Sequence, residues 1–195
     1  MDIFITKWIY RKTDKFFSYN SSFLSDILVK IYSQILNNFD LIHLHWVGHG
    51  FMSSNFLLNI KHEKLIITFH DFYFVTGGCH VPGDCSNYLR VCSNCPAKSY
   101  IGDFQLKNFN QKKVLFQSKK IFAIAPSEIM ASKLRGSSLG SLLYDIKIIP
   151  NPIDISLFKP LKSDFYNDSV FLKLPKDKPC LLFVANNLVD YNKGL

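Results

Sequence analysis

The sequence has no run of about 18 apolar residues, so we expect no transmembrane helix. Its first 15 residues mix charged and aromatic side chains without an uninterrupted apolar stretch or a small-residue cleavage site. They therefore do not resemble a signal peptide, and we expect a cytoplasmic protein. The G-x-G-x-x-G, P-loop, G-x-S-x-G and H-E-x-x-H patterns are also absent from the sequence, so none of these motifs indicates an activity.

Acidic residues are scarce, with 15 Asp and Glu against 23 Lys and Arg, which gives a net charge of +8. Such an excess fits either an ordinary solvated surface or attraction to phosphate, in a nucleotide, an anionic membrane surface or nucleic acid. The basic residues are scattered and no nucleic-acid module is recognisable, so we expect no nucleic-acid partner. A hydrophobic fraction of 48% predicts a folded core, and 195 residues suit one domain with part of a second.

Short apolar runs alternate with segments of helical periodicity. This alternation predicts an α/β fold, a Rossmann-like parallel sheet with helices on both faces. Ligands of such sheets bind beyond the carboxyl ends of the strands, where His70, Asp71, Ser127 and Asn151 fall. The predicted strands are residues 41–46, 64–69, 120–125, 145–149 and 180–185, and the predicted helices lie within 1–37, 51–60, 103–119 and 126–136.

Four of the five cysteines, Cys79, Cys85, Cys92 and Cys95, have the spacing C-x5-C-x6-C-x2-C among turn-forming residues. Two thiolates separated by two residues can chelate Zn²⁺, and two more complete a tetrahedron. Four protein ligands would make the zinc structural rather than catalytic. A reducing cytoplasm favours metal over disulfides, although an iron–sulfur cluster, two disulfides and free thiols remain alternatives. Cys180 is predicted to be a small buried side chain.

His70 and Asp71 follow a buried strand and precede a glycine-bearing loop. An imidazole at this position can bond a sugar hydroxyl or meet a developing charge near neutral pH. The alternative is a histidine that bonds backbone groups at the strand end. His43 and His45 share one side of a strand, and we expect them to line it rather than bind metal. Lys193, before Gly194, is a weak indication of phosphate binding, with an exposed lysine as the alternative.

Several motifs occur together in one order and resemble group 1 glycosyltransferases. More narrowly, they are similar to the cysteine-loop branch that includes colanic-acid and other exopolysaccharide or lipopolysaccharide transferases. The similarity spans about residues 40–160 and continues into 180–195. The motifs are Asp40–Trp46, Thr68–Asp71, the loop from Thr76 to Pro96, Ala125–Ser127, Arg135–Leu139, and Ile149–Asp154 with Phe158–Pro160.

The resemblance implies the GT-B architecture, in which the active site lies between two Rossmann-like domains. Residues 1–160 would form an incomplete amino-terminal acceptor-side domain with a cysteine-rich loop at 77–97. Residues 161–178 would be a linker, and 179–195 the first strand and loop of a donor domain. The implied reaction is retaining hexosyl transfer from a UDP- or GDP-sugar to a cell-surface polysaccharide or lipid-linked acceptor, without a catalytic metal. The chain would then lie at the inner face of the membrane.

The resemblance also implies residue roles. His70 would contact the transferring sugar, and Lys193 the donor diphosphate. Asp71, Gly77 and Gly78 would shape the acceptor side. Asn151 and Asp154 would belong to the interdomain hinge.

Two departures from the family pattern lead to a further expectation. We find no first strand with a glycine-rich turn before Asp40, and no paired-glutamate donor motif before Leu195. We therefore expect a chain truncated at both ends, or a split reading frame with a separately encoded donor-domain piece. The alternative function is a non-catalytic, zinc-stabilised remnant or binding domain.

Overall fold

The computed structural model describes residues 31–48, 51–96, 103–160, 178–179 and 181–185. The chain divides into two compact units, residues 1–150 and 151–195. Within the described ranges, all helices and strands belong to the first unit, and residues 31–36 there are helical. The further elements are β1 (His43–Leu44), α3 (Ser54–Asn59), β2 (Lys64–Thr68), η1 (Tyr73–Val75), η2 (Asn87–Leu89), α4 (Phe104–Ser118), β3 (Lys120–Ala125), α5 (Glu128–Gly136), η3 (Gly140–Leu142) and β4 (Asp145–Ile148).

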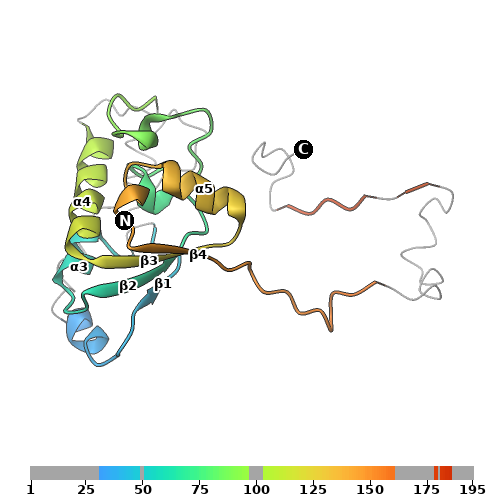
Figure 1. Ribbon diagram of the computed structural model, residues 1–195, viewed down its shortest axis with the longest axis horizontal. Coiled ribbons are helices and arrows are strands. Elements are labelled where there is room, and N and C mark those ends of the chain that lie inside the picture. Colours follow the sequence, from blue (N-terminus) through green and yellow to red (C-terminus); the bar gives the residue numbers. More distant parts are fainter. Residues whose placement is uncertain (1–30, 49–50, 97–102, 161–177, 180, 186–195) are drawn as a thin grey trace. The chain divides into compact units, whose positions relative to one another are not determined.

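The four strands form one parallel sheet in the order β1-β2-β3-β4 (Figure 1). The central pair is the longest, running from Lys64 opposite Lys120 to Thr68 opposite Ile124. This arrangement confirms the predicted α/β fold with a parallel sheet. Because the strands follow one another in sequence, right-handed crossovers place the connecting helices on the same face.

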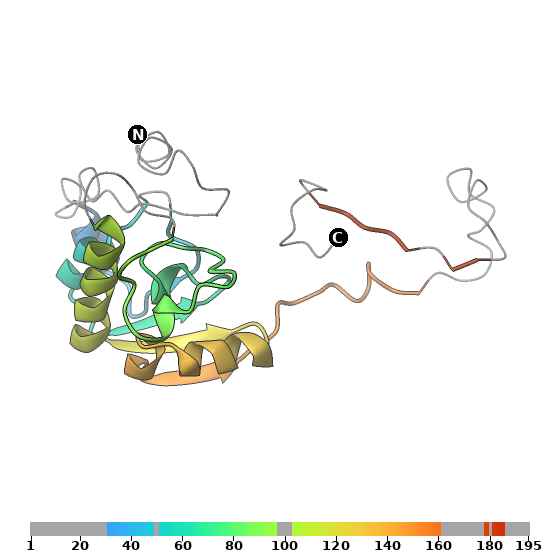
Figure 2. The same cartoon turned by 90° about the horizontal axis from the view of Figure 1, so that it is seen from above.

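The two faces of the sheet are buried unequally. Leu65, Ile67, Ile121 and Ala123 point to one face and are 0–1% exposed. They share a hydrophobic core with side chains of α4 and α5, both of which lie on one side of the sheet (Figures 1 and 2). On the opposite face, side chains such as Phe122 are only half-buried. Helices on both faces were predicted, whereas among the described residues α4 and α5 share one face.

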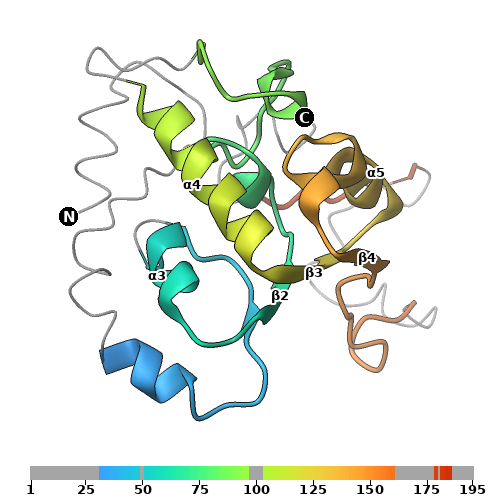
Figure 3. The same ribbon diagram turned by 60° about the vertical axis from the view of Figure 1, so that its left-hand side comes forward.

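The helix boundaries follow local capping. The Ser127 hydroxyl accepts a hydrogen bond from Met130 N at 3.2 Å, which makes Ser127 the N-cap of α5. The Asp103 carboxylate accepts one from Leu106 N at 3.4 Å at the start of α4. Helix α3 packs beside α4 (Figure 3).

Strand β1 is shorter than the predicted run of residues 41–46, because within the described residues only His43 and Leu44 pair with β2.

The second unit has no helix or strand in its described part, residues 151–160, 178–179 and 181–185. Asp154 organises a turn there, since its carboxylate accepts hydrogen bonds from the backbone and hydroxyl of Ser156. The predicted strand at 180–185 is not formed in residues 181–185, where Leu181 is 100% exposed. Lys193 and most of the predicted linker lie outside the described residues.

Candidate functional site

Three histidines gather where β1 and β2 end, because neighbouring parallel strands deliver their carboxyl ends to the same edge. We call His43, His45 and His70 the histidine cluster. His45 Nδ1 lies 2.9 Å from His70 Nε2, so one of these nitrogens donates a hydrogen bond to the other. The rings of His45 and His70 stack at 5.2 Å, and those of His43 and His45 lie 4.4 Å apart. All three side chains are exposed and can meet a ligand.

The environment of His43 favours its neutral form. Partial burial lowers the pKa of His43, and the nearby charges of His45 and His70 lower it further. His43 Nε2 also lies 2.8 Å from the hydroxyl of Thr68, which holds the ring against β2. The neutral form of His43 is therefore favoured, and its ring acts as a hydrogen-bonding group beside Thr68.

Asp71 is positioned by a second histidine, His80. Asp71 Oδ2 lies 2.5 Å from His80 Nδ1, and Asp71 Oδ1 accepts a hydrogen bond from Tyr73 N at 2.8 Å. His80 is 4% exposed and stacks on the Tyr73 ring at 5.4 Å. The Trp46 indole nitrogen lies 3.2 Å from the same Nδ1. We assign the Nδ1 hydrogen to the Asp71 carboxylate, the shorter and charge-assisted contact, so Trp46 contributes packing.

A buried lysine of α4, which was not predicted from the sequence, holds the loop that follows Asp71. Lys112 is 1% exposed, and its Nζ donates hydrogen bonds to the backbone oxygens of Tyr73 at 2.5 Å and Thr76 at 3.0 Å. Burial lowers the pKa of Lys112 to about 7, opposed by the nearby thiols and by Asp71. Its three-residue spacing from Phe109 and Leu115 was a usable signal, because it places Lys112 on the apolar face.

The predicted acceptor-side glycines let the loop approach the start of α4. A Cβ on Gly77 would lie 2.7 Å from the backbone oxygen of Gln105, closer than real contacts permit. Gly78 has a φ of 144° and donates its N–H to the Thr76 hydroxyl at 3.1 Å. Gly77 lines the cavity of the cysteines described next.

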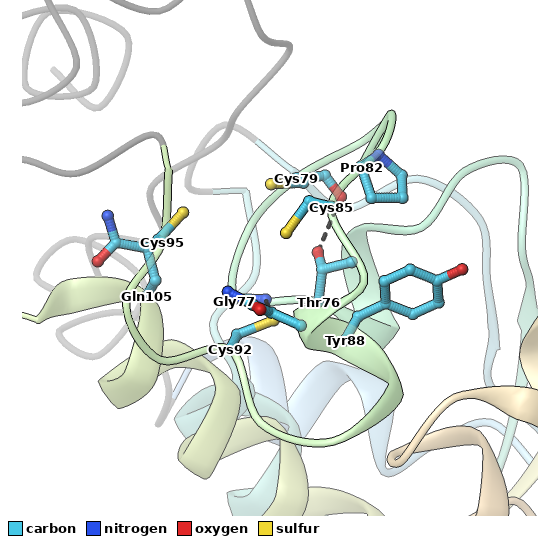
Figure 4. A pocket seen from close by; sticks show the side chains of 10 residues that line it. Thr76, Gly77, Cys79, Pro82, Cys85, Tyr88, Cys92, Cys95 and Gln105 are labelled. Carbon is cyan, nitrogen blue, oxygen red and sulfur yellow. Dashed lines mark hydrogen bonds between the residues drawn. The ribbon is translucent and has the colours of Figure 1, made fainter.

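The four loop cysteines line one small cavity of about 20 Å³, together with Gly77 and Gln105 (Figure 4). In the described part of the chain these four cysteines form no disulfide with one another. A hydrogen bond with Cys95, burial and the neighbouring thiols raise the pKa of Cys79. Burial raises the pKa of Cys92 to about 11, against a hydrogen bond of 3.2 Å from Gly77 N.

The zinc site at the four cysteines stays a prediction. Across residues 31–48, 51–96 and the other described ranges, no group of three or more His, Cys, Asp or Glu side chains is arranged to hold a metal ion. His43 contacts the Thr68 hydroxyl and His45 contacts His70. Cys180 lies outside the described residues.

The fold and the site define an α/β protein with a parallel sheet, a polar edge of histidines and one carboxylate, and an adjoining thiol-lined loop. Comparisons with protein-family models, curated proteins and solved structures give no match for this chain. Of the helices that the structure describes, none has both the length and the hydropathy to cross a membrane.

Proposed function

We propose that this chain is the acceptor-side part of a retaining GT-B glycosyltransferase of the group 1 family, which transfers a hexosyl group from a UDP- or GDP-sugar. The observation that carries the proposal is the exposed His45–His70 pair at the carboxyl edge of the parallel sheet. Ligands of parallel sheets bind at that edge, and a neutral imidazole both donates and accepts hydrogen bonds, as a sugar hydroxyl does.

His70 is the residue that contacts the transferring sugar. Its Nε2 is engaged by His45 at 2.9 Å, so Nδ1 is the ring atom that faces the sugar. When His45 donates in that pair, His70 carries its hydrogen on Nδ1 and donates to a sugar hydroxyl. In the transfer, the acceptor oxygen bonds to the anomeric carbon while the bond to the diphosphate breaks. The nucleoside diphosphate leaves, and the hydroxyl proton passes to its phosphate or to water.

The other residues serve binding. The Asp71–His80 pair gives the acceptor side a fixed carboxylate. Gly77 and Gly78 let the loop that follows Asp71 lie close to the carboxyl edge of the sheet. Lys193 neutralises the leaving diphosphate, and a donor domain, whether continuous or separately encoded, completes the nucleotide site. No catalytic divalent metal is required. The acceptor is a saccharide or lipid-linked saccharide at the cytoplasmic membrane face, where the charge of +8 attracts anionic lipids.

The test is nucleotide release from a panel of UDP- and GDP-sugars by the full chain, because donor hydrolysis needs no known acceptor. We expect release to fall by about a hundredfold or more in His70→Ala, because removing one hydrogen-bond donor to a transition state costs about 10²–10³ in rate. His62→Ala is the matched control, since His62 bonds the Phe39 carbonyl away from the cluster. Release must persist in this control.

A binding measurement completes the test. Imidazole resonances of His45 and His70 are followed by NMR while each donor is added, and we expect shifts confined to the cluster. Release that is indifferent to His70 would overturn the proposal. So would a folded chain that shows neither release nor imidazole shifts, and that result would favour the alternative, a non-catalytic binding domain.

A further inference from the structure

We propose that Cys79, Cys85, Cys92 and Cys95 bind one structural Zn²⁺ that fixes the loop between β2 and α4. This inference is independent of the proposed glycosyl transfer. It rests on the shared cavity of the four thiols, on the backbone turns that carry them, and on hydrogen-bond donors that a metal-bound sulfur would satisfy.

The backbone is bent so that the thiols face a common space. The side chains of Cys79, Cys85 and Cys95 point toward one another, and Cys92 lies below them (Figure 4). Two bends require the left-handed region, Gly83 with φ 57° and Asn94 with φ 46°. Asn94 lies inside the Cys92–Cys95 turn, and asparagine tolerates this conformation at small cost. The C-x2-C turn is thus sharply bent at Asn94.

One buried donor beside the cavity lacks the acceptor that a thiolate would provide. Gln105 is 1% exposed and lines the cavity, and among the described residues its Nε2 has no hydrogen-bond partner. An unsatisfied buried donor costs about 1–3 kcal/mol, so such an atom calls for an explanation. Gly77 N already points to Cys92 Sγ at 3.2 Å. Donors of this kind to metal-bound sulfur are the usual outer shell of a metal site.

The side chains that line the cavity indicate which metal ion it would bind. Its lining includes four thiols and no carboxylate, which disfavours Mg²⁺ and Ca²⁺ because they bind through oxygen. Four sulfur ligands in tetrahedral geometry suit Zn²⁺. A cavity of about 20 Å³ holds one ion-sized occupant. On binding, Zn²⁺ replaces four thiol protons, which pass to the buffer, and four zinc–sulfur bonds form without any change of oxidation state.

Metal binding would also act on the neighbouring carboxylate. Cys79 directly precedes His80, whose ring holds Asp71 at 2.5 Å. The Cys79 carbonyl is itself tied to the Thr76 hydroxyl at 2.8 Å. Closing the four thiols around an ion therefore fixes the segment that carries His80, so the metal is a positioning device for the Asp71–His80 pair.

The first test counts and identifies the metal in the full chain. Protein purified without added chelator is analysed by mass spectrometry for metals, and we expect one zinc per chain. Metal-free protein is then titrated with Co²⁺ alone. We expect the ligand-field bands of tetrahedral cobalt and thiolate charge-transfer bands, both abolished by one equivalent of Zn²⁺. Neither readout requires a variant to fold.

Variants assign the ligands. Cys85→Ser and Cys95→Ser should each weaken Co²⁺ binding by more than about tenfold, and Gln105→Leu by about tenfold through the lost outer-shell hydrogen bond. Cys180→Ser, which removes the one cysteine outside the loop, must bind as the wild type does. Folded protein with no metal and five reactive thiols would overturn the inference. So would disulfides between these cysteines, or iron in place of zinc. None of these results depends on nucleotide release.

Discussion

Gly140 tests how η3 packs against the end of α5, because the structure leaves no room for a methyl group at this position. A Cβ at Gly140 would lie 1.7 Å from the Leu134 backbone oxygen and 2.5 Å from the Ser137 hydroxyl. That hydroxyl closes the end of α5, donating to Leu134 O at 2.8 Å and accepting from Gly140 N at 3.0 Å. The Gly140→Ala chain must therefore move its backbone and give up both hydrogen bonds.

The magnitude follows from these contacts. Two hydrogen bonds contribute about 1 kcal/mol each, and forcing an extra carbon into a packed region costs about 1–3 kcal/mol. We expect Gly140→Ala to lower the free energy of unfolding by about 3–5 kcal/mol. Gly136→Ala is the matched control, since no atom lies within 4 Å of its added Cβ. At this helical position alanine should raise the free energy of unfolding by up to about 1 kcal/mol.

The assay is urea denaturation of both variants, followed by far-ultraviolet circular dichroism under one set of conditions. The difference between the variants is more informative than either value, because the same glycine-to-alanine change is made four residues apart. If the two free energies of unfolding agree within about 0.5 kcal/mol, the ordinary scatter of surface substitutions, the described contact between η3 and α5 is wrong.

Three further predictions concern other elements. Ser127→Ala should lower the free energy of unfolding by about 1 kcal/mol by removing the N-cap of α5, and restoration by an aspartate there is the check in denaturant melts. Gly77→Ala should weaken the Co²⁺ binding of the loop, because its Cβ would press on the Gln105 backbone; unchanged affinity would contradict that contact. Since the pKa of His43 is lowered in the folded state, the unfolded chain binds this proton more tightly. Stability should therefore fall as the pH drops below about 6.5. His43→Gln should reduce that fall, as measured by urea unfolding between mildly acidic and neutral pH.

The sheet could be predicted from the sequence because its central strands are fully apolar on one face. Residues 64–69 and 120–125 were predicted as strands, and β2 and β3 occupy Lys64–Thr68 and Lys120–Ala125. Strand β1 was overestimated, since the length of an edge strand depends on its partner and not on its own composition. The one-sided placement of α4 and α5 follows from strand order, which hydrophobic periodicity does not encode.

The site was predictable only where it follows directly from a strand end. His70 was placed correctly beyond β2, and the structure brings it to His45. The pairing of Asp71 with His80 could not be predicted, because it depends on how the loop folds back over nine residues. The spacing of Lys112 indicated a place on the apolar face of α4, but its partners could not be predicted. They are backbone carbonyls 39 and 36 residues away, and a sequence does not show which backbone oxygens accept hydrogen bonds.

The reactivity of the buried Lys112 amine can be used to measure how often the structure opens locally around α4. An amine-reactive reagent can reach Lys112 only when α4 and the Tyr73–Thr76 segment separate, whereas its neighbour Lys113 is exposed and reacts at once. The ratio of the two labelling rates, read by peptide mass spectrometry, measures the free energy of that separation. A ligand at the histidine edge or an ion in the thiol cavity that closes this segment should slow the labelling of Lys112 alone.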